Sequence, residues 1–332
     1  MQFVSEADDT LVEKVEATGT RIAEVRAGVG RIIFGQEAAV DQALIGLLSG
    51  GHVLLVGVPG LAKTRLVETL GTVLGLDERR VQFTPDLMPA DILGSEVLEE
   101  SDTGSRSFRF IHGPVFCQLL MADEINRASP RTQSALLQAM QEHEVSVAGH
   151  RHKLPHPFHV IATQNPLEQE GTYPLPEAQL DRFFMEIDID YPDLEAERRM
   201  VLATTGSDDA VARRVLSAEE LIDIQALVRH IPVGNQVLDA ILGPVRAARP
   251  GPDASDEINR QVAWGPGPRG AQALMLAVRA AALIDGRFAP SVDDVIALAR
   301  PVLRHRMALT FAARADGLTV EKVIDRLCAP YA

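Results

Sequence analysis

The stretch Val53-Leu-Leu-Val-Gly-Val-Pro-Gly-Leu-Ala-Lys-Thr64 decides the fold of this chain. It has the pattern of an apolar strand, a glycine-turned loop and the start of a helix whose apolar residues recur at helical spacing. Backbone N–H groups at the mouth of such a helix form a cradle for phosphate. The lysine can reach the β- and γ-phosphates, and the threonine hydroxyl can ligate Mg²⁺. The stretch therefore predicts a phosphate-binding loop, and the alternative is a plain Gly/Pro turn between a strand and a helix.

The loop departs from the strict phosphate-loop pattern at one position. Ala62 stands before the lysine, where the strict pattern has glycine. Both turn glycines are in place. The residues expected to contact a nucleotide are Gly57, Pro59, Gly60, Leu61, Ala62, Lys63, Thr64 and Arg65.

Composition narrows the class of protein. The chain has 332 residues, 46% of them hydrophobic, and a net charge of −14. That charge argues against generic binding to duplex DNA, which depends on clustered Lys and Arg. Two cysteines, Cys117 and Cys328, provide no disulfide framework, which fits a reducing compartment. The acidic N-terminus does not have the pattern of a signal peptide, so we expect a cytoplasmic protein.

One uncharged stretch has the length of a membrane span. Residues 43–62 carry no formal charge over twenty positions. Ser49-Gly50-Gly51 and the loop beginning at Gly57 interrupt it twice, so we interpret it as part of the nucleotide-binding core and predict no membrane segment.

Strand and helix signals alternate beyond the loop, which predicts a parallel α/β sheet with helices on both faces. The strand candidates are His52–Val56, Arg80–Thr84, Gln118–Ala122, Phe158–Thr163 and Phe184–Ile189. From about Asp193 onward, amphipathic helical segments dominate. We predict an N-terminal helical segment (1–30), an α/β nucleotide-binding core (31–205) and a small all-helical domain (206–332).

A second motif places two carboxylates at a strand end. The buried stretch from Val115 ends in Asp123-Glu124, and open α/β sheets bind ligands at the carboxyl ends of their strands. Asp123 is expected to hold Mg²⁺ and Glu124 to polarise the attacking water. Adjacent acidic residues alone are often solvated, but here they follow a phosphate loop.

Three further polar residues are candidates for the reaction. Asn165 follows another strand and can orient water, although Asn-Pro also starts turns. Arg182 ends a short helix and can complete a neighbouring subunit's site, or it is a helix-end charge. Arg269 stands at a helix start in Gly265-Pro-Gly-Pro-Arg-Gly270, where a lid folded over the core would let it sense the γ-phosphate.

These elements, in this order, resemble the AAA+ ATPases and, within them, the MoxR family. The motifs are IFGQE (33–37), GVPGLAKT (57–64), DLMPADILGSEV (86–97), ADEINRASPRTQSALLQAMQE (122–142), ATQNP (162–166), GTYPLPEAQLDRF (171–183) and GPGPRG (265–270). Family members also carry LAKT, so the resemblance accommodates Ala62.

The resemblance implies the following roles: Lys63 and Thr64 in Walker A, Asp123 and Glu124 in Walker B, Asn165 as sensor 1, Arg182 as arginine finger, Arg269 as sensor 2, and Gly35 and Gln36 in the adenine pocket. It implies ATP and Mg²⁺ (Thr64, Asp123) as ligands and a small helical lid after the five-stranded core. Arg127 can reach a subunit boundary, but an ordinary salt bridge is the simpler expectation.

Two insertions are predicted as β-hairpins. One spans Leu98–Phe110 with a turn at Ser101–Ser105, and the other spans Glu144–Leu154 with a turn at Ala148–Gly149. Such inserts resemble those of the AAA+ clade that holds MoxR, magnesium chelatase and the MCM helicases. In ring assemblies they tend to face the pore or one ring surface, which makes them candidates for client contact.

Two basic segments are interpreted as exposed. Five histidines lie between His143 and His159, and without a companion carboxylate or cysteine at ligand spacing a polar hairpin is favoured over a metal site. Arg304-His-Arg306 is interpreted as a solvated helix face.

The resemblance implies a Mg²⁺-dependent ATPase that works as a homo-oligomeric ring, most simply a hexamer, and remodels or matures a protein client. The MoxR family is typically paired with von Willebrand factor A-domain proteins. The alternatives are a nucleotide-gated scaffold and, disfavoured by the charge, an MCM-like DNA motor; we therefore expect no nucleic-acid partner.

Overall fold

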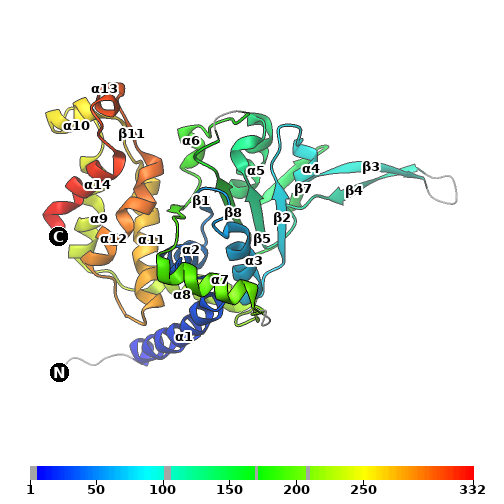
Figure 1. The fold of residues 1–332 in the computed structure, drawn as a ribbon, viewed down its shortest axis with the longest axis horizontal. Helices are drawn as coiled ribbons and strands as arrows, with labels where there is room; N and C mark the ends of the chain where they lie inside the picture. The colour runs from blue at the N-terminus through cyan, green and yellow to red at the C-terminus, as the bar shows by residue number, and fades with distance from the viewer. Residues whose placement is uncertain (1–5, 101–105, 169–170, 207–209) are drawn as a thin grey trace.

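The computed structural model describes residues 6–100, 106–168, 171–206 and 210–332. Five parallel strands form the central sheet in the order β2-β5-β8-β1-β9 (Figure 1). Their bounds are β1 Val53–Val56, β2 Glu78–Gln82, β5 Leu119–Asp123, β8 His159–Gln164 and β9 Met185–Asp188. All five predicted strands are confirmed, with ends displaced by one or two residues.

The three inner strands, β5, β8 and β1, are buried on both faces, as their near-continuous apolar sequences require, whereas the edge strand β2 is polar and largely exposed. Alternation along β1 sends Val53 and Leu55 into one hydrophobic cluster and Leu54 into another. The first cluster includes α2 (Glu37–Leu48) and α3 (Lys63–Val73), and the second includes α5 (Pro130–Glu142). The helices on each face thus fix the strand ends, where the polar residues lie.

The other helices of the N-terminal two thirds flank this core. They are α1 Glu6–Gly30, α4 Pro89–Leu93, α6 Glu177–Leu180 and α7 Leu194–Thr205, with a short 3-10 helix at Ile125–Arg127. The helix α1 packs against α2 and α3 of the core and also against α11 of the C-terminal region.

The C-terminal region is helical, as predicted. Its helices are α8 Ala218–His230, α9 Asn235–Ala247, α10 Asp256–Gln261, α11 Pro268–Ile284, α12 Val292–Leu303, α13 Phe311–Ala315 and α14 Val320–Cys328, with 3-10 helices at Arg304–Arg306 and Ala329–Tyr331. Pro268 stands in the first turn of α11, where its missing N–H has no cost. One addition was not predicted: β10 (Val262–Trp264) and β11 (Ala308–Leu309) pair as a short antiparallel ribbon.

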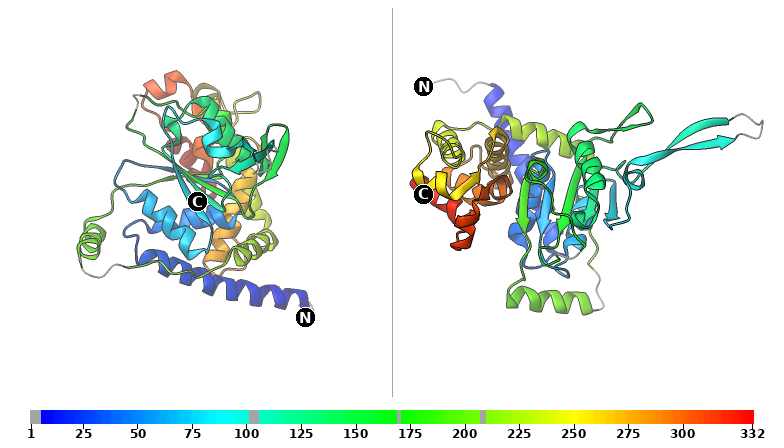
Figure 2. Two further views of the ribbon diagram at one scale, coloured as in Figure 1. Left: turned by 90° about the vertical axis from the view of Figure 1, so that its right-hand side faces the viewer. Right: turned by 90° about the horizontal axis from the view of Figure 1, so that it is seen from above.

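Both predicted hairpins are confirmed in the described residues. The first consists of β3 (Gly94–Glu100) and β4 (Arg106–His112), and it projects from the body (Figures 1 and 2). Its turn, at residues 101–105, lies outside the described residues. The second consists of β6 (Glu144–Val147) and β7 (His150–Lys153), and it turns at Ala148–Gly149.

The core and the C-terminal helices share one continuous apolar cluster, which includes Leu44 of α2, Leu221 of α8 and Leu283 of α11. The two parts therefore pack as one body. The interpretation of Arg304-His-Arg306 as a solvated face is wrong: His305 is 5% exposed and Arg306 is 2% exposed. The partners that make this burial tolerable lie about 120 residues earlier in the chain, in 181–188, where no local pattern reveals them.

The uncharged stretch 43–62 divides among α2, β1 and the loop, as interpreted from its glycines. Within the described part of the chain, no helix combines the length and apolar character needed to cross a bilayer.

Candidate nucleotide-binding site

The loop between β1 and α3 has an unusual backbone. Gly60 has φ +87° and Ala62 has φ +57°, so both occupy the left-handed region. For Ala62 this conformation is strained, which explains why glycine is the usual residue there. A Cβ on Gly57 would lie 2.6 Å from the carbonyl oxygen of Ile189, whereas a Cβ on Gly60 would meet open space. The loop is thus packed at its start and open at its tip.

Lys63 folds back over this loop. Its Nζ donates to the carbonyl oxygens of Gly57 and of Val58, the latter at 3.1 Å. Partial burial lowers the pKa of Lys63, and the nearby Asp123 and Glu124 carboxylates act in the opposite direction. The ammonium therefore lies within electrostatic reach of both acidic residues, at the mouth of α3.

Asp123 ends β5 and is almost fully engaged. Its Oδ2 accepts from Arg80 Nη2 at 2.6 Å and from Arg80 Nε at 3.1 Å, and its Oδ1 accepts from the Thr163 hydroxyl at 2.6 Å. Asp123 is 7% exposed, and Arg80 supplies the positive charge that burial of the carboxylate requires.

Glu124 follows directly with φ +56°, an uncommon conformation for a residue other than glycine. Its backbone N–H donates to the Thr163 hydroxyl at 2.8 Å. Its Oε2 accepts from Gln82 at 2.7 Å and from Arg127 at 2.9 Å. The expectation that Arg127 forms an ordinary salt bridge is therefore confirmed.

Three residues of this constellation were missed from the sequence: Arg80, Gln82 and Thr163. A signal for the first two was present, because residues two apart on a strand share a face and both are polar. The pairing of Gln82 with Asp123 in register places that face beside the two carboxylates. Thr163 is the last fully buried residue of β8 and offered no signal beyond its place before Gln164-Asn165.

Asn165 lies at the same edge, just beyond β8, and is 4% exposed. Its Oδ1 accepts from the Leu167 N–H at 3.1 Å. In this arrangement the side chain stabilises the turn that carries Pro166, which is the structural role left open by the sequence.

A cavity of about 320 Å³ adjoins the loop. It brings together most of the predicted nucleotide-contacting residues, namely Gln36, Pro59, Gly60, Leu61, Ala62 and Arg65. Tyr191 and Pro192, which lead into α7, and Met200 of α7 also line it. Gly35 does not line the cavity. Glycine is needed at this position for packing, because a Cβ on Gly35 would lie 2.6 Å from the Cβ of Ala196.

These features fit a nucleotide with Mg²⁺. The open, glycine-turned tip leaves room for phosphate oxygens, and Lys63 supplies positive charge. Thr64, at the start of α3, and Asp123 offer the oxygen ligands that Mg²⁺ prefers. The largely apolar cavity beside them has the character of a base-binding pocket.

Arg182 and Arg269 lie elsewhere. Arg182 precedes β9, at the amino ends of the strands, whereas the loop follows the carboxyl end of β1. The backbone N–H of Phe184 donates to the carbonyl of His52, so Arg182 lies near the start of β1. The five residues from His52 to Gly57 span about 16 Å at the rise of a parallel strand, which separates Arg182 from the loop. Arg269 lies beside Arg182, with its Nη1 3.7 Å from Asp181 Oδ2. Neither arginine therefore meets its own chain's phosphate loop.

Among the described residues, no side chain is bonded to or ion-paired with the Arg182 guanidinium, although that residue is only partly exposed. Arg269 is 54% exposed at its side chain. Both arginines line one cavity of about 160 Å³ with His52 and Met140.

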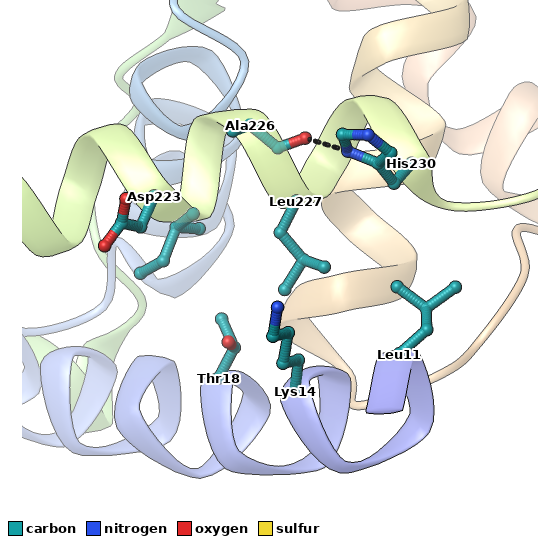
Figure 3. A pocket seen from close by; sticks show the side chains of 8 residues that line it. Leu11, Lys14, Thr18, Asp223, Ala226, Leu227 and His230 are labelled. Atoms are coloured by element: carbon teal, nitrogen blue, oxygen red, sulfur yellow. Dashed lines mark hydrogen bonds between the residues drawn. The ribbon is translucent and has the colours of Figure 1, made fainter. Parts of the chain in front are cut away.

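Another cavity, of about 720 Å³, lies between α1 and α8 (Figure 3). Lys14 and Thr18 of α1 face Asp223 and Leu227 of α8 across it, and the His230 ring bonds the Ala226 carbonyl. It contains no residue of the phosphate loop or of the strand ends.

The described histidines of the 143–159 segment have structural contacts. His152 stacks on Phe110 of the other hairpin, with ring centroids 3.9 Å apart, and His159 is 1% exposed. In the described ranges, no group of three or more His, Cys, Asp or Glu residues could hold a metal ion.

The chain is similar to known proteins over most of its length. The model of the ATPase family associated with various cellular activities (AAA) matches residues 52–185, and that of the AAA lid domain matches residues 255–327. Chaperone MoxR1 of Mycobacterium tuberculosis is 44% identical over 300 residues, which is 90% of this chain and 78% of that protein. Protein MoxR of Paracoccus denitrificans is 33% identical over 312 residues, 87% of this chain and 89% of that protein.

The fold is also matched in a crystal structure. A protein from Cytophaga hutchinsonii that is described as a putative ATPase superposes with a TM-score of 0.89 at 35% identity, covering 98% of both chains. The motif order, the five-stranded core with its helical lid and these relatives agree. The chain belongs to the MoxR family of AAA+ ATPases, and it is an ATPase.

Proposed function

We propose that the chain hydrolyses ATP with Mg²⁺ at the carboxyl edge of its sheet, and that hydrolysis remodels or matures a protein client. In this proposal Lys63 and the loop N–H groups hold the phosphates, and Gln36 and the apolar cavity hold the base. Thr64 and Asp123 hold Mg²⁺, which would neutralise charge on the phosphate oxygens. Glu124 orients and polarises the attacking water, and Asn165 assists.

Arg80, Gln82 and Arg127 bear on this proposal because they already hydrogen-bond the two carboxylates. For Asp123 to hold Mg²⁺, the Arg80 guanidinium has to move away from the Asp123 carboxylate. For Glu124 to act on water, its Oε2 must be released from Gln82 and Arg127. In this proposal, both carboxylates therefore exchange partners when nucleotide and Mg²⁺ bind.

We propose that catalysis is completed by a second copy. The observation that carries this is the position of Arg182 and Arg269, side by side at the amino edge and away from their own loop. A guanidinium without an internal partner is available to a transferred phosphoryl group of a neighbour. A homo-oligomeric ring, most simply a hexamer, repeats that contact around a closed symmetry axis.

The client is proposed from similarity and from surface chemistry. A relative at 44% identity is named a chaperone, and the MoxR resemblance points to a von Willebrand factor A-domain protein. The β3–β4 hairpin supports client contact, because it projects from the body and exposes Leu98 (51%) and Phe108 (71%) directly opposite each other. Exposed apolar pairs of this kind are typical of protein-binding surfaces.

A mixing experiment tests the shared site. Arg182→Ala should bind ATP normally but lose turnover, about 10³-fold or more. Glu124→Gln should bind ATP and fail to hydrolyse it. In mixed assemblies, an Arg182→Ala subunit keeps its Glu124 and receives Arg182 from a Glu124→Gln neighbour, so activity should recover. No recovery in assemblies shown to be mixed, or an active Arg182→Ala, would overturn the proposal.

A further inference from the structure

Arg306, in the 3-10 helix after α12, is the feature that the site described above does not use. It is 2% exposed, and all five of its N–H donors are engaged. Its Nε donates to Asp181 Oδ1 at 2.9 Å. Its Nη2 donates to the Phe183 carbonyl at 2.6 Å and to the Asp181 carbonyl at 3.5 Å. Its Nη1 donates to the carbonyls of Phe184, at 3.1 Å, and of Val302.

Three of these acceptors bracket Arg182. The Asp181 carbonyl lies before it and those of Phe183 and Phe184 lie after it, so one lid guanidinium fixes the backbone on both sides of the candidate finger. His305 adds a bond to the Phe183 carbonyl, at 3.1 Å. Phe183 itself is fully buried, so the segment is also held from below by packing.

Asp181 connects the same group to Arg269. One carboxylate oxygen takes Arg306 Nε, and the other lies 3.7 Å from Arg269 Nη1. The two arginines proposed to act on a neighbour are thus joined through one carboxylate, and Arg306 is the buried member that orients it.

A buried ion pair is a costly way to join two parts of a protein. Apolar packing of similar volume is often as stable or more stable. Apolar side chains cannot, however, hold three carbonyl groups in set directions, and a lysine has only three donors on a flexible stem. The donors of Arg306 therefore indicate that it orients the backbone around Arg182 and does more than join the lid to the core.

We propose that Arg306 is a positioning residue for the arginines that each subunit donates, so that the lid of one subunit controls hydrolysis in its neighbour. This inference rests on the proposed role of Arg182. Arg306 acts through the backbone around Arg182 and through Asp181, and it does not itself reach the nucleotide.

Arg304 provides a matched control. It is a neighbouring lid arginine that also pairs with core carboxylates, Glu186 at 2.8 Å and Asp188 at 2.7 Å. Those residues lie on β9, beyond the segment that Arg306 holds. Arg306→Lys and Arg304→Lys make the same chemical change two positions apart.

The test measures ATP affinity, turnover and mixing with Glu124→Gln. Arg306→Lys should keep ATP affinity, because its own loop is untouched, and lose about 10- to 100-fold in turnover through misplacement of the finger. Arg304→Lys should stay within about threefold, because Arg304 pairs with carboxylates of β9 and not with the backbone around Arg182. Glu124→Gln neighbours, which carry an intact Arg306, should restore turnover to Arg306→Lys.

The outcomes separate this inference from the proposed function. If Arg182→Ala is rescued on mixing but Arg306→Lys is not, or if Arg306→Lys turns over normally, the positioning role is overturned while the shared site stands. If Arg182→Ala is not rescued, the shared site and the positioning role fall together. Should Arg306→Lys not fold, Asp181→Asn tests the same contact from the core side, with the same mixing pattern expected.

Discussion

The two edges of the central sheet differ in how their charges are satisfied. At the carboxyl edge, Asp123 and Glu124 are paired within the chain, with Arg80 and Arg127. At the amino edge, the guanidinium of Arg182 has no hydrogen-bond or ion-pair partner among the described residues, and that of Arg269 has only the 3.7 Å contact to Asp181. The first edge holds the acidic groups of a site, and the second presents the cations that such a site needs. This difference supports the proposal that a second copy completes the site.

The largest expected effect distinguishes the edges directly. Glu124→Gln keeps the size of the side chain and removes its basicity, so turnover should fall about 10²- to 10⁴-fold while ATP still binds. Steady-state hydrolysis and titration with a fluorescent ATP analogue measure the two quantities. Glu142→Gln, on the exposed end of α5, is the control. Equal turnover in Glu124→Gln and the control would show that the catalytic carboxylate does not lie at the carboxyl edge.

Lys63→Ala should weaken ATP binding about 100-fold, since the loop N–H groups alone cannot neutralise the phosphates. The same titration measures it, and Lys153→Ala, on the exposed hairpin, is the control. Circular dichroism should show that the fold is kept, because Lys63 bonds only carbonyls of its own loop. An unchanged affinity would mean that this loop does not cradle phosphate.

The amino edge should be the more acid-sensitive one. Burial lowers the pKa of His52 to about 3 and that of His159 to about 4, and it also lowers the pKa of His305. The His52 ring is held neutral: Nδ1 accepts from the Val160 N–H at 2.9 Å and Nε2 donates to the Met140 carbonyl at 3.1 Å.

Because the unfolded chain takes up protons on these histidines below about pH 6.5 and the folded chain does not, acid should favour unfolding. Each histidine should lower the free energy of unfolding by up to about 1.4 kcal/mol per pH unit between pH 6.5 and its folded pKa, with no such loss above that range. Urea titrations from pH 7.5 to 4.5 measure the slope. His159→Gln should remove one histidine's share, and an unaltered slope would contradict this account.

The smallest effect on chemistry is expected far from both edges. Leu98→Ser with Phe108→Ser should leave basal turnover within about threefold, because the hairpin touches neither edge, and should weaken stimulation by the partner. Glu100→Ser with Arg106→Ser alters an opposed, exposed pair on the same strands and is the control. ATPase rates with and without a von Willebrand factor A-domain protein from the same genome measure it. Full stimulation of the apolar variant would place client contact elsewhere.

Much of this molecule could be predicted from the sequence, because the information is local. The loop, the carboxylates at the end of β5 and Asn165 after β8 belong to strand–turn patterns only a few residues long, and parallel strands bring their carboxyl ends to one edge. The strands and both hairpins follow from apolar runs and turn residues for the same reason. The short β10–β11 ribbon could not be predicted in this way, since strands of two or three residues show no periodicity in the sequence.

Only the tertiary structure decided how distant charges are paired. Arg80 and Gln82 gain their roles from strand register beside Asp123. Arg306 looks like a solvated residue in the sequence and is buried, because its five donors meet a carboxylate and carbonyls that lie more than 100 residues away or in the preceding helix. The sequence shows which side chains are charged. Whether such a charge can be buried depends on partners that only folding brings within hydrogen-bonding distance.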